Sequence, residues 1–123
     1  MFGKTAYRAL ALAATLAAAG PHLAQAHAFP KTSEPAKDAI VSPAPTALKI
    51  WFTQKIEPAF SKVEVDDAAG KPVDQGDAQV DGQDQTLLHV SLKALPPGTY
   101  KVVWHVVSVD THATNGDFTF TVK

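Results

Sequence analysis

The chain has 123 residues, a formal charge of −1 at pH 7, no cysteine and a single methionine, Met1. The absence of a basic patch argues against a nucleic-acid or anionic-membrane partner. The absence of cysteine excludes disulfides and thiolate metal ligands. A transition-metal site in the body of this chain would therefore need nitrogen and oxygen donors, which disfavour Cu(I).

The first 26 residues have the pattern of a secretory signal peptide. Lys4 and Arg8 supply a positive start, residues 9–19 are apolar, and Ala24-Gln25-Ala26 has the small-x-small form of a signal-peptidase site. The apolar run is too short for a comfortable membrane span, although an uncleaved anchor is the alternative. We predict a cleaved signal peptide, 1–26, and one mature domain, 27–123. Losing two of the 11 basic residues leaves 9 against 12 acids, a charge near −3 with histidine neutral.

Short strand patterns follow, without a helical period. Prolines are dense in residues 27–45, and because proline opposes both helix and central strand, only a short edge strand is predicted there, near 27–33. Apolar and polar residues alternate over 47–53 and 62–66, which predicts two strands with a loop between them. Gly70 then fits a hairpin turn at positive φ.

The second half of the chain contains the strongest strand pattern. Residues 73–80 are weakly patterned and predict an edge strand, whereas 86–92, 100–109 and 117–122 alternate clearly, the longest of them as a central strand. About seven short strands with a turn every ten residues or so indicate an all-β antiparallel sandwich.

Asp110 and His112 stand two residues apart at the end of the longest strand pattern. Residues i and i+2 of an extended chain point to the same face, so both side chains can address one small target. Cleavage after Ala26 would make His27 the first residue, and its α-amine and imidazole Nδ1 can then chelate one ion. Together these groups give three nitrogens and one oxygen, a tetragonal set that favours Cu(II).

A simpler interpretation stays open. Residues 110–116 can be a plain turn in which the aspartate accepts backbone N–H bonds, and a histidine at the cleavage site can be coincidence. The metal site also requires the two ends of the domain to meet, which periodicity does not show. His89 and His105 are interpreted as ordinary surface or half-buried residues, and His22 would leave with the signal peptide.

Several segments in order resemble the CopC family of small periplasmic copper-binding proteins, and together they span essentially the whole mature chain. The most specific piece is Val-Val-Ser-Val-Asp-Thr-His, residues 106–112. The other pieces are His-Ala-Phe at 27–29, Thr-Ser-Glu-Pro-Ala at 32–36, Phe-Thr-Gln at 52–54, Ile-Glu-Pro at 56–58, Phe-Ser-Lys at 60–62, Pro-Gly-Thr-Tyr-Lys-Val-Val-Trp at 97–104, Asn-Gly at 115–116 and Phe-Thr-Phe at 118–120.

The resemblance implies a seven-stranded Greek-key, cupredoxin-like (Ig-like) sandwich or barrel, monomeric and in the periplasm. It implies one Cu(II) per domain, held by the amine and imidazole of His27 with Asp110 and His112. It also implies a role in copper resistance or uptake, beside an inner-membrane partner of the CopD type. Without methionine in the mature part, the chain resembles the members that have only the Cu(II) site. Gln54 replaces a glutamate that some members place near the copper, and Glu57 matches a different family position.

The leading hypothesis is therefore a copper carrier or buffer that is not an enzyme. A second hypothesis is a copper oxygenase, because an amine–imidazole chelate with a second histidine resembles a histidine brace. A third is a metal-free β-sandwich that serves as an interaction module.

Overall fold

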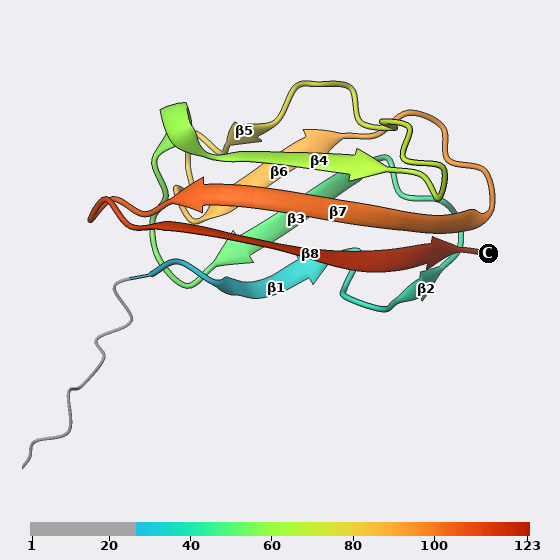
Figure 1. Ribbon diagram of the computed structural model, residues 1–123, viewed down its shortest axis with the longest axis horizontal. Helices are drawn as coiled ribbons and strands as arrows, with labels where there is room; N and C mark the ends of the chain where they lie inside the picture. The colour runs from blue at the N-terminus through green and yellow to red at the C-terminus, as the bar shows by residue number, and fades with distance from the viewer. Residues whose placement is uncertain (1–26) are drawn as a thin grey trace, which may run out of the picture.

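The computed structural model describes residues 27–123, and the predicted signal peptide lies outside the described residues. Two four-stranded sheets pack face to face in the described part (Figure 1). One sheet has the order β1 (Pro30–Glu34), β3 (Ala47–Phe52), β6 (Leu87–Ser91), β5 (Gln79–Val80), and the other β2 (Ile40–Val41), β8 (Ala113–Val122), β7 (Gly98–Val107), β4 (Lys62–Asp66). A single 3-10 turn, η1 (Pro58–Phe60), is the only helical element within residues 27–123.

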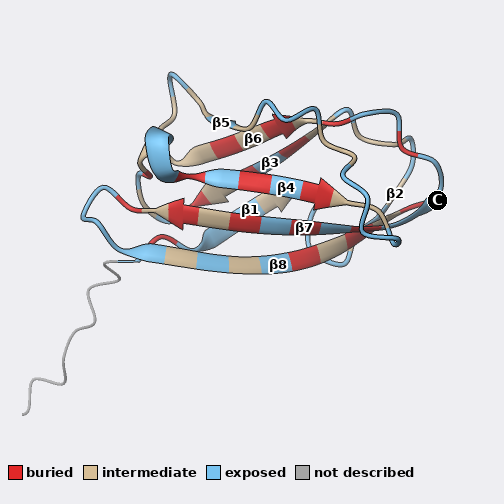
Figure 2. Cartoon of the chain, turned by 45° about the horizontal axis from the view of Figure 1, so that its top comes forward, coloured by how far each residue is buried: buried red, intermediate tan, exposed pale blue. Residues whose placement is uncertain are grey.

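Alternation of apolar and polar residues produces the core between the sheets. Figure 2 shows buried residues alternating with exposed ones along β4 and β7. The inward residues of β3, β6, β7 and β8 are Leu48, Ile50, Phe52, Leu88, Val90, Tyr100, Val102, Trp104, Val106, Phe118, Phe120 and Val122. Burial of each such aliphatic or aromatic side chain contributes roughly 1.5–3 kcal/mol to the stability of the fold. The apolar core between the two sheets is therefore the main stabilising feature.

The long hairpin of β7 and β8 positions the candidate site. Its strands pair without a register shift from Gly98↔Val122 to Val107↔Ala113. The connecting turn, residues 108–112, projects at one end of the sandwich, and the start of the described chain lies at that same end, on the left of Figure 1. A rigid ribbon therefore carries the predicted Asp-x-His segment to the N-terminal arm.

The predicted all-β, cupredoxin-like sandwich is confirmed, with three local differences. There are eight strands in the described part instead of seven, because Ile40–Val41 pairs with the end of β8, and this pairing is parallel. The expected strand over 73–80 is reduced to β5. Aspartates hold that segment in turns, with Gly76 N donating to Asp74 Oδ2 at 3.0 Å. Residues 115–116 lie inside β8 rather than in a turn.

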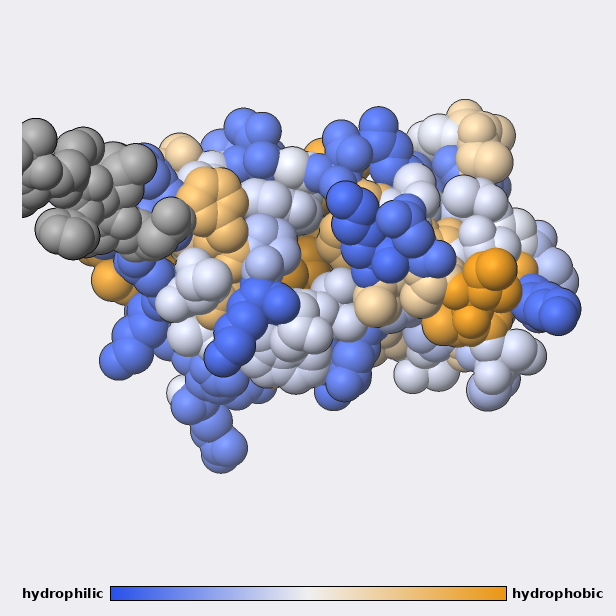
Figure 3. Space-filling view, turned by 90° about the horizontal axis from the view of Figure 1, so that it is seen from below, coloured by the Kyte–Doolittle hydropathy of each residue, from blue (hydrophilic) through white to orange (hydrophobic). Residues whose placement is uncertain are grey.

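No helix within residues 27–123 has the length and apolar character needed to cross a bilayer. The side of the sandwich seen from below shows separate hydrophobic patches among hydrophilic side chains (Figure 3). This face therefore has no continuous apolar surface.

Candidate metal centre

The N-terminal arm is fixed against both sheets. Ala28 is fully buried, and its carbonyl accepts a 2.7 Å hydrogen bond from the Thr114 hydroxyl of β8. Phe29 N–H donates to Thr53 Oγ1 at 3.1 Å, and Thr53 N–H donates back to the Phe29 carbonyl at 2.8 Å. These bonds place the preceding residue, His27, at the end of the β7–β8 hairpin.

The turn over residues 108–112 is closed by its own backbone. Ser108 N–H donates to the His112 carbonyl at 2.9 Å, and Thr111 N–H donates to the Ser108 carbonyl at 2.8 Å. Thr111 has φ 74°, a left-handed conformation that is unusual for a β-branched residue. Asp110 and His112 are therefore not on one face of an extended strand, and the expectation based on strand alternation was wrong. The tight turn brings them together instead.

The structure places His112 beside each of the other two predicted residues. The His27 and His112 rings have centroids 4.6 Å apart and planes at 76°. His112 Nδ1 lies 3.4 Å from Asp110 Oδ1, and all three residues are exposed. The requirement that the two ends of the domain meet is thus fulfilled.

The surroundings of Asp110 favour the ionised form of its carboxyl group. Its pKa lies below the ordinary aspartate value, mainly because the Ser108 hydroxyl donates a hydrogen bond to its carboxylate, and further because His112 lies beside it. The ionised carboxylate makes the local electrostatic potential more negative, and the neighbouring imidazole offers a nitrogen donor. Both properties favour the binding of a cation.

The donor types fit a Cu(II) ion. Two nitrogens bound to one metal lie at most about 4 Å apart, since each metal–nitrogen bond is about 2 Å. The His27 and His112 rings are in contact, with centroids 4.6 Å apart. Within residues 27–123, no three His, Cys, Asp or Glu side chains are grouped tightly enough to hold a metal by themselves. The predicted site also includes the α-amine that the predicted cleavage before His27 would release.

The other residues that the sequence raised lie elsewhere or make other contacts. His89 and His105 project from the outer faces of the sheets, since their neighbours Leu88 and Val106 are buried. His89 Nε2 lies 3.6 Å from Asp81 Oδ1. The Glu57 backbone N–H donates to the Val107 carbonyl at 2.7 Å, which anchors the loop.

Sequence reasoning missed Ser108. It is fully buried, and it continues the inward alternation of β7 one step beyond Val106. That register was visible in the sequence, because every second residue from Tyr100 onward points inward. A serine at the next inward position, directly before the Asp-x-His segment, was the available signal.

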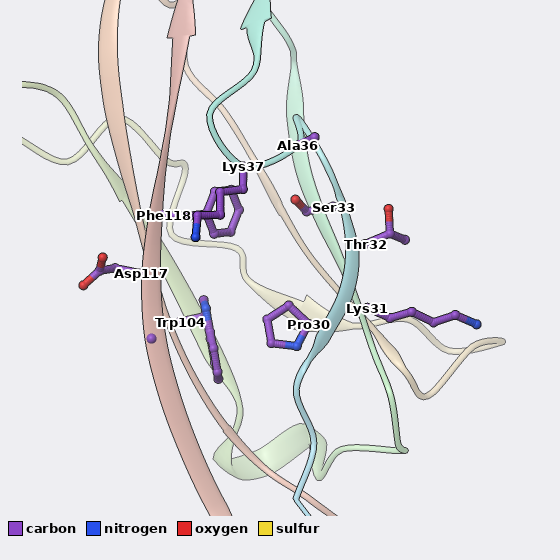
Figure 4. A pocket seen from close by; sticks show the side chains of 10 residues that line it. Pro30, Lys31, Thr32, Ser33, Ala36, Lys37, Trp104, Asp117 and Phe118 are labelled. Carbon is purple, nitrogen blue, oxygen red and sulfur yellow. The ribbon is translucent and has the colours of Figure 1, made fainter.

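A hollow of about 470 Å³ opens between β1 and β8, and none of the three predicted site residues lines it. Figure 4 shows Trp104, Phe118 and Pro30 around it, with the Asp117 side chain directed away. The site is therefore a surface arrangement at the end of the sandwich, separate from this hollow.

These features define a small β-sandwich whose N-terminal arm meets the turn of its longest hairpin in a histidine pair. The chain belongs to the CopC family, since the CopC domain model matches residues 30–123. Two curated relatives illustrate its range. Protein YobA of Escherichia coli K12 is 41% identical over 99 residues, 80% of each chain. Copper resistance protein C of Xanthomonas campestris pv. juglandis is 32% identical over 126 residues, 96% of this chain and 98% of the relative.

Solved structures show the same fold. CopC from Methylosinus trichosporium OB3b superposes with a TM-score of 0.70 at 29% identity, covering 79% of this chain and 94% of that one. PcoC from Escherichia coli, described as a methionine-rich copper resistance protein, gives 0.68 at 33% identity, covering 79% and 99%. The present chain differs from that description, because its only methionine is Met1.

Proposed function

We propose that this protein binds copper in the periplasm, as one Cu(II) per domain, and acts in copper resistance or in delivery to an inner-membrane importer. The observation that carries the proposal is the contact between the His27 and His112 rings, 4.6 Å between centroids. The names of family members, copper resistance protein C among them, support copper as the cargo. The signal-peptide pattern of residues 1–26 supports export.

Each donor has a defined part in this proposal. The His27 imidazole and α-amine form a chelate after signal cleavage, His112 adds a second imidazole, and Asp110 adds one anionic oxygen. Nitrogen and oxygen donors of this kind suit Cu(II) in a tetragonal arrangement. The amine has an ordinary pKa near 8 and binds without its proton, so affinity falls as pH falls.

A carrier role is favoured over an oxygenase. A carboxylate in the coordination set would occupy a position that an oxygenase leaves open for its reactant. Copper-loaded protein is therefore expected to hold the ion without consuming oxygen when a reductant is added. Sustained oxygen uptake above that of free copper would contradict the carrier role.

Titration of the processed domain, residues 27–123, with Cu(II) against a competing chelator tests the site. The His112→Ala variant is expected to lose much of the affinity, whereas His89→Ala, which changes a histidine on an outer sheet face, is expected to keep it. Equal affinity of wild type and His112→Ala would contradict the assignment.

A further inference from the structure

Ser108 is a buried polar residue behind the candidate site. Ser61 and Ser108 are the buried polar side chains among residues 27–123, and Ser108 has no exposed surface. Burying a hydroxyl costs free energy unless it is hydrogen-bonded, so its contacts identify its role. Its Oγ contacts the Asp110 carboxylate, the His112 N–H at 3.3 Å and the His112 carbonyl at 3.2 Å.

The chemistry of a hydroxyl decides between these contacts. Ser108 Oγ has one proton to donate and two lone pairs that accept. The ionised carboxylate of Asp110 is a stronger acceptor than the His112 carbonyl, which already accepts the Ser108 N–H at 2.9 Å. The O–H therefore donates to Asp110, and a lone pair accepts the His112 N–H. One buried oxygen thus holds two neighbouring residues.

Asp110 and His112 need such support. Their side chains are 39% and 50% exposed, and exposed side chains sample several rotamers. Fixing a mobile side chain on a ligand costs conformational entropy at the moment of binding. The hydrogen bonds from Ser108, at the end of β7, restrict these residues before the ion binds, and so reduce the entropy lost on binding.

We propose that Ser108 is the positioning residue of the copper site: its hydroxyl presets the Asp110 carboxylate and the His112 backbone in the metal-free protein. This inference rests on the proposed function, because positioning has meaning only if the site binds copper. In this role Ser108 would act through its two neighbours and would not itself be a ligand.

Ser108→Ala removes the hydroxyl with little change in volume, and Ser61→Ala is the matched control. Ser61 is the other buried serine, and its Oγ accepts from Val107 N at 3.3 Å, also near the end of β7. In the processed domain, Ser108→Ala is expected to weaken Cu(II) affinity about 10- to 100-fold, as loss of a group that orients a metal ligand does. Ser61→Ala is expected to bind close to wild type.

Backbone amide NMR of the metal-free proteins gives a readout independent of copper. Ser108→Ala is expected to broaden or shift the amides of residues 109–112 and leave those of β3 and β6 unchanged. If Ser108→Ala fails to fold, Ser108→Cys provides the test, since it keeps a similar shape with only a weak S–H donor. The same loss of affinity is expected from it.

A double-mutant cycle separates positioning from plain stability. If Ser108 acts through Asp110, Ser108→Ala in an Asp110→Ala background causes much less additional loss than in wild type. Fully additive losses would overturn the route through Asp110, and equal affinity of Ser108→Ala and wild type would overturn the positioning role as a whole, while either result leaves copper binding intact. A wild-type domain that fails to bind copper would contradict the proposed function itself.

Discussion

The imidazole of His27 lies against the imidazole of His112, with ring centroids 4.6 Å apart, although the two residues stand near opposite ends of the described chain. Two features produce this contact. The β7–β8 hairpin carries His112 to the end of the sandwich, and the buried Ala28 anchors the arm that precedes β1. This contact involves only the two imidazole rings. The α-amine of His27 becomes a free donor only after the predicted cleavage of the signal peptide.

Blocking the α-amine of His27 is expected to weaken copper binding sharply. Acetylation of the processed N-terminus converts this amine into an amide, which is a poor donor, while the imidazole side chains are unchanged. Isothermal titration of the acetylated and unacetylated proteins with Cu(II) measures the difference. Amidation of the carboxylate of Lys123, at the exposed C-terminus, is the matched control. Unchanged binding by the N-acetylated protein would show that the amine is not a ligand.

Thr114→Val is expected to loosen the N-terminal arm. The Thr114 hydroxyl donates to the Ala28 carbonyl at 2.7 Å, and valine keeps the shape without the donor. Loss of one such bond reduces the free energy of unfolding by about 1 kcal/mol, and more where the carbonyl stays buried. Copper affinity should fall as well, since His27 is no longer held beside His112.

Thr99→Val is the control for that change. Thr99 also lies in the long hairpin, but at its far end, where its hydroxyl pairs with that of Thr121 at 3.3 Å on the exposed surface. Urea unfolding and copper titration of both variants separate the effects. A copper affinity that falls equally in both would contradict the specific role of the arm.

The fold was largely predictable because, along a strand, the alternation of apolar and polar residues follows the alternation of buried and exposed positions. Leu88, Val90, Phe118 and Phe120 all face the core as expected. β2 was missed because two residues, Ile40–Val41, carry no periodic pattern. The failed strand over 73–80 reflects competition: carboxylates such as that of Asp74 capture backbone N–H groups that a ladder would otherwise use.

The residues of the candidate site could be proposed from the sequence, but their arrangement in space could not. His27, Asp110 and His112 came from residue type and family resemblance, and their role as copper ligands stays a prediction. Their meeting depends on Thr114 and Ser108, which bond to backbone or side chains of other residues. Such hydrogen bonds produce no periodic pattern in a sequence. A serine or threonine looks the same in the sequence whether its hydroxyl is exposed to solvent or bonded to another part of the chain.

Acid is expected to destabilise the metal-free protein. The pKa of Asp84 lies below its ordinary value of 3.8, mainly because the Thr86 hydroxyl and N–H donate to it, and the pKa of Asp77 is lowered by bonds from Ser91. A carboxyl whose folded pKa is depressed contributes stability above its unfolded pKa and loses it as pH falls through the folded value. The melting temperature should therefore hold above about pH 5 and fall below about pH 4.

Asp84→Ala checks the cause of that acid sensitivity. Without this carboxylate, the protein is expected to be less stable at neutral pH and to lose less further stability on acidification from about pH 5 to about pH 3. Asp117→Ala, which removes an exposed carboxylate of β8, is the matched control and should keep the wild-type pH profile. Parallel profiles for Asp84→Ala and wild type would contradict the prediction.

Gly116→Ala is expected to disturb the core beneath β8. A Cβ at this position would lie 2.6 Å from Cζ2 and 2.9 Å from Cε2 of Trp104, too close for either ring atom. Trp104 cannot retreat freely, because its ring packs edge-on against Phe52 at 5.3 Å between centroids. Overpacking of this kind costs roughly 1–3 kcal/mol, so the urea midpoint should fall.

Gly82→Ala is the control for that substitution, since a Cβ there meets no atom within 4 Å. Its urea midpoint should stay near that of wild type. Tryptophan fluorescence in a Trp51→Phe background reports the same event locally, because Trp104 is then the only tryptophan of the sequence. Its emission should change in Gly116→Ala and stay the same in Gly82→Ala. Equal midpoints and spectra for the two variants would show that the strand moves aside without cost, and that glycine is not required where β8 crosses the Trp104 ring.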